Sequence, residues 1–159
     1  MKILVVSDTH RKLENLKVIL EREQPMDLLI HLGDAEGDED SIAEMAGCRL
    51  EIVAGNNDFF SNLPREKELR IGSYRVLITH GHYYYVSAGI ADIEREAAAQ
   101  GYDIVMFGHT HRPVIDYKRD VIALNPGSLS YPRQEGRRPS YIVMDLDKNG
   151  KANFEIKYL

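Results

Sequence analysis

The side chains best suited to chemistry follow short apolar runs. Five such runs each end in a cluster of polar residues and glycine: Asp8 and His10; Gly33 and Asp34; Gly55, Asn56, Asn57 and Asp58; Thr79, His80, Gly81 and His82; and Gly108, His109, Thr110 and His111. In an extended segment residues i and i+2 point to the same side, so Asp8 with His10, and His109 with His111, can face one ligand. Carboxylate, amide and imidazole donors without a thiolate suit divalent ions such as Mn²⁺, Fe²⁺ and Zn²⁺.

The elements that must position these clusters form a mixed α/β pattern. Apolar periodicity predicts helices over residues 12–23, 39–46 and 90–100. It predicts strands over 3–6, 28–32, 50–53, 68–71, 74–78, 104–107, 114–117, 121–124, 141–145 and 153–157. Strand and helix alternate in the first half, which indicates a parallel core, whereas short turns in the second half favour antiparallel pairing. Because ligands bind beyond the carboxyl ends of strands in open α/β sheets, we expect the five clusters to converge.

Composition sets the broad class. The chain has 159 residues, of which 43% are hydrophobic and 28% charged, so we expect a single globular domain over residues 1–159. No apolar run has the roughly 18 residues of a membrane helix, and the first run is too short for a signal peptide, so we expect no membrane partner. Cys48 is the one cysteine, which we expect to be inert, in a cytoplasmic protein. A net charge of −5 argues against broad nucleic-acid binding.

The five clusters, in this order along the chain, resemble the motifs of the calcineurin-like metallophosphoesterases. The segment Asn125, Pro126, Gly127 and Ser128 extends the likeness to the small bacterial and archaeal phosphodiesterase branch, which is related to vacuolar sorting protein 29 of retromer. The resemblance covers nearly the whole chain. It implies a four-layer α/β/β/α sandwich of two mixed β-sheets flanked by helices.

The resemblance also implies a dinuclear metal site. One ion would be held by Asp8, His10, Asp34 and His111, and the other by Asp34, Asn56, His80 and His109. Asp34 would then bridge two divalent ions, for which we expect Mn²⁺, with Fe, Zn, Ni or Mg as alternatives. A hydroxide shared by the ions would attack the phosphorus of a small phosphodiester or phosphomonoester.

Three further residues are expected beside the ions. Many family members have histidine where this chain has Asn57, and that histidine helps to protonate the leaving group. We therefore expect a preference for good leaving groups, unless His82 or a metal-bound water supplies the proton. Asp58 is expected either to support the loop of the third cluster by accepting hydrogen bonds or to stabilise a plain turn. His31 lies within a strand and is expected to be a hydrogen-bonded core residue.

Two other stretches allow two interpretations each. Arg133, Arg137 and Arg138 form a solvated loop or, as the alternative, contact a substrate phosphate. The tyrosines at positions 83–85 either line a pocket that stacks on a nucleobase or pack in the core or at a homo-oligomer interface.

The sequence thus predicts a metal-dependent phosphoesterase. One alternative is a non-catalytic protein-binding scaffold like the retromer relative, but here all seven ligand positions carry good donors. The other is a nuclease, against which the acidic composition and the lack of a DNA-capping domain argue.

Overall fold

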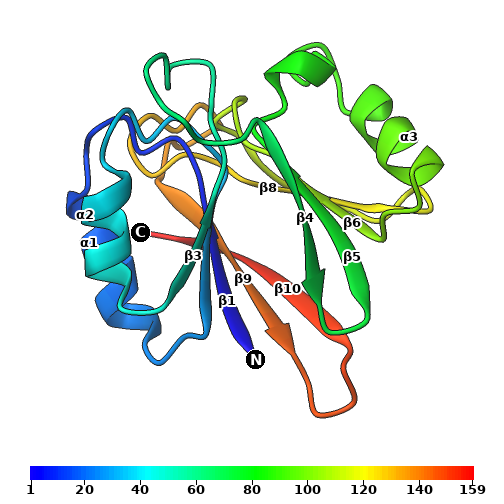
Figure 1. Ribbon diagram of the computed structural model, residues 1–159, viewed down its shortest axis with the longest axis horizontal. Helices are drawn as coiled ribbons and strands as arrows, with labels where there is room; N and C mark the ends of the chain where they lie inside the picture. The colour runs from blue at the N-terminus through cyan, green and yellow to red at the C-terminus, as the bar shows by residue number, and fades with distance from the viewer.

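The computed structural model describes residues 1–159 and contains two five-stranded sheets packed face to face (Figure 1). The first sheet has the order β10-β9-β1-β2-β3 and the second β4-β5-β6-β8-β7. The strands of the first sheet are β1 (Lys2–Val6), β2 (Leu28–His31), β3 (Arg49–Ile52), β9 (Ser140–Leu146) and β10 (Ala152–Tyr158). Those of the second are β4 (Glu66–Ile71), β5 (Tyr74–Thr79), β6 (Ile104–Met106), β7 (Pro113–Asp116) and β8 (Ile122–Pro126).

Helices cover the outer face of each sheet. The helices α1 (Glu14–Glu23) and α2 (Glu39–Ala46) pack on the first sheet, and α3 (Ala91–Ala99) packs on the second (Figure 1). The molecule is therefore an α/β/β/α sandwich, as the sequence predicted. None of the three α-helices combines the length and apolar character needed to cross a membrane.

The continuous apolar runs are explained by burial on both strand faces. In β1, Ile3 and Val5 belong to the core between the two sheets, whereas Leu4 and Val6 belong to the core beneath α1 and α2. In the second sheet, Met106 faces the first sheet and Val105 faces α3. Each inner strand thus packs against two layers and needs apolar side chains on both faces.

The pairing in the second half differs in part from the prediction. Within the second sheet, β5, β6 and β8 run parallel, and the edge strands β4 and β7 pair antiparallel to their neighbours. In the first sheet, β9 pairs antiparallel with both β10 and β1, as predicted. The parallel β5–β6 pair uses α3 as its crossover, whereas β6 and β8 are connected through β7. The short turns therefore agree with the antiparallel β4–β5, β7–β8 and β9–β10 pairs, but the inner strands of the second sheet run parallel.

A buried ionic network joins the end of α1 to the first sheet. The Glu23 side chain, 3% exposed, lies 2.8 Å from Lys2 Nζ and 3.0 Å from Lys157 Nζ, and it accepts a 2.9 Å hydrogen bond from the Tyr141 hydroxyl. Burial alone would raise the pKa of Glu23, but these donors outweigh it and lower the pKa to about 2. The ionised carboxylate is therefore stabilised in the folded protein.

Glu23→Gln is expected to lower the free energy of unfolding at pH 7 by about 2–3 kcal/mol. Because the folded pKa lies below the unfolded value, this contribution is complete above about pH 4.5 and is lost as the pH falls towards 2. Urea unfolding at several pH values would measure it, with Glu155→Gln as the control, since Glu155 is 69% exposed and meets the same Lys157 at 3.9 Å. Equal destabilisation by the two variants at pH 7 would contradict the prediction.

Candidate metal centre

The chain segments that follow β1, β2, β3, β5 and β6 meet at one edge of the sandwich. Backbone hydrogen bonds join them: the Asp8 N–H donates to Gly33 O (3.0 Å), and the Gly108 N–H donates to His80 O (3.1 Å). The His109 N–H crosses between the sheets to Asp8 Oδ2 (3.1 Å). All seven sequence-predicted metal ligands are brought together here.

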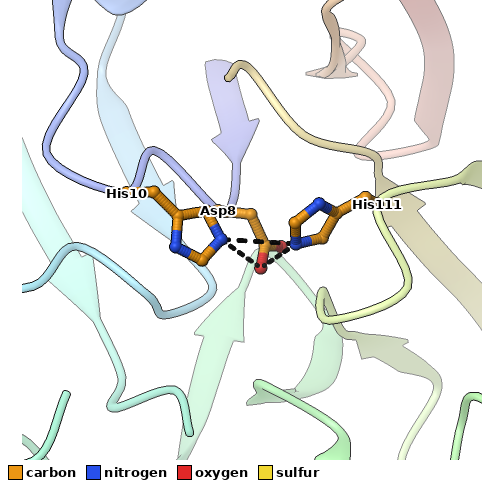
Figure 2. A group of neighbouring side chains, drawn as sticks. All are labelled: Asp8, His10 and His111. Atoms are coloured by element: carbon orange, nitrogen blue, oxygen red, sulfur yellow. Dashed lines mark hydrogen bonds and ion pairs between the residues drawn. The ribbon is translucent and has the colours of Figure 1, made fainter. Parts of the chain in front are cut away.

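One group of donors consists of Asp8, His10 and His111. The two imidazoles approach the Asp8 carboxylate from opposite sides (Figure 2). From Asp8 Oδ1, His111 Nε2 is 3.0 Å away and His10 Nε2 is 3.6 Å away, and the two Nε2 atoms are 3.3 Å apart. Three potential ligand atoms thus face a single point.

A second group surrounds Asp34. Its Oδ2 atom lies 3.5 Å from His80 Nε2 and 3.7 Å from His10 Nε2, and so sits between the two groups, where a bridging ligand would be. Asn56 Oδ1 is 2.9 Å from both His80 Nε2 and His109 Nδ1. The arrangement favours His80 over His82 as the ligand of the fourth cluster, because His82 makes no such contact.

Three of the imidazoles are oriented by acceptors behind them. The Nδ1–H of His80 donates to Leu32 O (2.7 Å), that of His111 to Tyr131 O (2.7 Å) and that of His10 to Glu36 Oε1 (2.6 Å). Each bond turns Nε2 towards the centre, as in metal sites where an acceptor fixes the ligand histidine. Sequence reasoning missed these acceptors, two of which are backbone carbonyls that no residue type could reveal.

The electrostatics of the cluster favour a bound cation. Asp8 Oδ1 is buried and accepts no hydrogen bond, although such oxygens nearly always have a partner. Burial would raise the pKa of Asp8, but the neighbouring imidazoles, led by His80, hold it well below its usual range. Burial would likewise lower the pKa of His10, but the carboxylates of Asp8 and Glu36 raise it to about 9. The residues therefore fit divalent ions: the ionised Asp8 carboxylate attracts positive charge among the imidazoles.

The backbone at the centre adopts an unusual conformation. Asp8, His10, Asp34, His109 and His111 all have φ between +46° and +69°. Left-handed backbone costs a non-glycine residue on the order of 1–3 kcal/mol and is concentrated at functional sites. The fold therefore holds five of the seven donors in place against a local conformational preference.

Asn57 and Asp58 hold the loops around Asp34. The Asn57 backbone and side-chain N–H groups donate to the two Asp34 carboxylate oxygens at 2.9 and 2.8 Å. Asp58 is buried and accepts hydrogen bonds from the N–H groups of Asp34, Glu36 and Gly55 at 2.6–2.8 Å. Of the two readings of Asp58, the structure supports the loop-supporting one, since its contacts reach across two loops.

His82 lies beside the centre. Its ring centroid is 5.4 Å from that of His80, its Nδ1 is buried without a partner, and it lines a cavity with Asn56 and Arg65. Of the following tyrosines, Tyr83 and Tyr85 are exposed, and Tyr84 donates to Glu66. Tyr83 stacks on His82 and lines that same cavity, which agrees with the pocket-wall interpretation for this one tyrosine.

The segment from Asn125 to Ser128 supports two of the site loops. The Asn125 amide donates to Gly108 O (2.8 Å), and the Ser128 hydroxyl donates to Asp8 O (2.8 Å). His31 is a core residue, as expected: the Gly33 N–H donates to its Nδ1, and its Nε2 contacts Thr9 Oγ1. Burial lowers the pKa of His31 to about 4, so the ring is neutral.

The loop arginines separate into two groups. Arg133 and Arg137 line a cavity with His10 and His111. Arg138 instead donates to Leu159 O and lies over the Tyr158 ring, on another side of the molecule. The phosphate-contact interpretation is therefore wrong for Arg138, because the backbone directs its side chain towards the C-terminus.

Comparison with known proteins identifies the family. The model of the calcineurin-like phosphoesterase superfamily domain matches residues 1–149. A probable metallophosphoesterase of Bacillus subtilis is 34% identical over 153 residues, covering 94% of this chain and 86% of the relative. A phosphodiesterase of Methanocaldococcus jannaschii is 30% identical over 145 residues, covering 80% and 83%.

Solved structures show the same fold. A predicted phosphoesterase of Streptococcus pneumoniae superposes with a TM-score of 0.82 at 28% identity, covering 99% of this chain and 88% of that one. Vacuolar protein sorting 29 of Cryptosporidium parvum superposes with a TM-score of 0.75 at 19% identity, covering 99% and 97%, a likeness in fold alone. The ordered motifs, the convergent donors and the match over residues 1–149 lead to one conclusion: this chain belongs to the calcineurin-like phosphoesterase superfamily.

Proposed function

We propose that this protein is a phosphodiesterase that depends on two divalent metal ions and acts on a small substrate. The observation that carries the proposal is the convergence of seven residues with oxygen and nitrogen donors at one edge of the sandwich, among them a buried Asp8 carboxylate oxygen that has no hydrogen-bond partner. Two divalent ions at such a site supply Lewis-acid activation of a phosphoryl group and of a water nucleophile. The phosphodiesterase name of an archaeal relative supports the diester as substrate.

The residues of the chain have separate tasks in this proposal. Asp8, His10, Asp34 and His111 would hold one ion, and Asp34, Asn56, His80 and His109 the other. Glu36, Leu32 O and Tyr131 O keep three imidazoles turned towards the ions, and Asn57 and Asp58 fix the Asp34 loop. The protein-binding alternative has support only from the fold of its relative, and the net charge of −5 does not favour a nuclease.

Metal dependence is the direct test. Protein stripped with a chelator and reconstituted with Mn²⁺ is expected to hydrolyse bis(p-nitrophenyl) phosphate, and the stripped protein is expected to be inactive. Release of p-nitrophenolate measures both, with p-nitrophenyl phosphate as the monoester comparison. Lack of turnover with each of Mn²⁺, Fe²⁺, Zn²⁺, Ni²⁺ and Mg²⁺ would refute the proposal, as would undiminished activity after complete metal removal.

The leaving group should strongly affect the rate. The Asn57 carboxamide has no acidic proton and is bound to Asp34, so position 57 cannot protonate the departing oxygen. A positioned general acid contributes about 10²–10⁴-fold, so we expect diesters with alkyl leaving groups to react at least about 10²-fold more slowly than p-nitrophenyl diesters. A series of diesters with graded leaving-group pKa measures this dependence. A flat series would show that another group donates the proton, and the same series with His82→Ala would show whether that group is His82.

A further inference from the structure

Four arginines are distinguished by having no partner. The chain has twelve arginines. Eight have guanidinium groups that pair with a carboxylate, donate to a backbone carbonyl or lie over a tyrosine ring. The remaining side chains, those of Arg11, Arg112, Arg133 and Arg137, make no hydrogen bond, ion pair or ring contact, and all four line cavities beside the metal centre.

Three of them share one cavity. Arg112, Arg133 and Arg137 line a space of about 740 Å³, and His10 and His111 of the metal centre form part of the same wall. The single carboxylate in that wall belongs to Glu36, which already accepts the His10 Nδ1–H at 2.6 Å. Three arginines with unpaired guanidinium groups therefore line this cavity without a free carboxylate beside them, in a protein whose net charge is −5.

The backbone fixes two of these arginines relative to the metal centre. Arg112 directly follows His111, and the Arg133 N–H donates to His111 O at 2.9 Å. The neighbouring Tyr131 carbonyl accepts the His111 Nδ1–H at 2.7 Å. The segment that carries Arg133 is thus hydrogen-bonded to His111, and Arg112 is the next residue after His111. The backbone of both arginines is therefore fixed beside the metal centre.

The positive charge of this cavity is more than is needed to bind the scissile phosphodiester. A phosphodiester carries one negative charge, which the metal centre can match by itself. Arginine presents a planar set of donors that suits phosphate, and such charge-assisted bonds are stronger than neutral ones. The three unpaired guanidinium groups can therefore bind an additional anionic group on the same substrate molecule.

We propose that the substrate carries a second phosphate group, which binds in the cavity lined by Arg112, Arg133 and Arg137 while the scissile diester lies at the metal centre. This inference rests on the proposed function and specifies its substrate class. The substrate would be a phosphodiester that carries a separate phosphomonoester outside its leaving group. Arg138, in the same loop but outside the cavity, has no part in it.

The test compares two diesters with the same leaving group. Thymidine 5′-(p-nitrophenyl phosphate) and its 3′-phosphorylated counterpart both release p-nitrophenolate, but only the second has the additional phosphate. With Mn²⁺-loaded protein we expect kcat/KM to be at least about 10-fold higher for the phosphorylated diester. In the Arg112→Ala, Arg133→Ala double variant this ratio should fall to within about twofold of one, whereas Arg138→Ala should keep the wild-type ratio.

The outcomes separate this inference from the function on which it rests. Equal kcat/KM for the two diesters in the wild type, or a preference that survives in the double variant, would overturn the inference and leave the phosphodiesterase proposal intact. If the metal-loaded wild type released no p-nitrophenolate from either diester, the proposed function would fail, and calorimetry would decide the inference alone. Thymidine 3′,5′-bisphosphate should then bind at least 10-fold more tightly than the 5′-monophosphate to the wild type and not to the double variant, and equal affinities would overturn the inference.

Discussion

Asp34→Asn is expected to lower kcat/KM for a phosphodiester by about 10²–10³-fold while the protein stays folded. Asp34 Oδ2 lies 3.5 Å from His80 Nε2 and 3.7 Å from His10 Nε2, so its carboxylate can serve both donor groups. Asparagine keeps the shape of the side chain but removes its negative charge. It also turns an amide N–H₂ towards one of the Asn57 donors that now contact the carboxylate.

Thermal unfolding gives a second readout of the same substitution. An ion that binds only the folded state raises the melting temperature, and the increase grows with the ratio of the ion's concentration to its dissociation constant. We expect Mn²⁺ to stabilise the wild type and to stabilise Asp34→Asn far less. Asp40→Asn removes the same charge from an exposed position of α2 and should change neither the activity nor the metal-induced shift. Full activity in Asp34→Asn, or an unchanged shift, would contradict the assignment of Asp34 as a shared ligand.

The positions of the strands along the chain and the convergence of the site could be predicted because both depend on local pattern. Runs such as residues 3–6 and 104–107 are apolar at every position, which is what a strand buried on both faces requires. The polar clusters follow these runs directly, and the ends of neighbouring parallel strands meet at one edge. Asp8 and His109 are therefore adjacent in space although they are 101 positions apart in the chain.

Other features of the site depend on tertiary geometry that residue types do not encode. The acceptors behind His80 and His111 are the carbonyls of Leu32 and Tyr131, and any residue offers a carbonyl. Arg138 and Arg137 have different surroundings although they are adjacent, because the backbone of this loop turns at Arg137, which has φ of +45°. The parallel β6–β8 pair could not be predicted because its connection runs through β7, without a helix.

The glycines at the site are also explained by tertiary packing, and not only by turns. Glycine lets the backbone turn where a strand ends, and Gly33, which follows β2, has φ of +99°. Gly55 has no positive φ, so a side chain there would meet no backbone strain. What excludes it is space, because a Cβ at Gly55 would lie 2.1 Å from Asp34 Oδ1 and 2.5 Å from Asp34 N.

Gly55→Ala is accordingly expected to lower kcat/KM by about 10²-fold, through displacement of Asp34 and without removal of any donor. A separation of 2.1 Å is far shorter than van der Waals contact, and the Asp34 side chain and backbone must move to relieve it. A shift of about 1 Å at a reacting centre can cost on the order of 10²-fold in rate. Phosphodiester kinetics would measure the loss, and metal titration followed by thermal unfolding should show a weaker Mn²⁺ affinity.

The matched control is another glycine with room for a methyl group. A Cβ at Gly47, which follows α2 with φ of +61°, would meet nothing within 4 Å. Gly47→Ala should therefore cost about 1 kcal/mol of stability through its backbone conformation and leave kcat/KM unchanged. If Gly55→Ala behaved like Gly47→Ala, with stability lowered and activity kept, then the position of Asp34 would not control the reaction. If instead Gly55→Ala lost activity and regained none of it at high Mn²⁺, misplacement of Asp34 would affect the reaction itself as well as metal affinity.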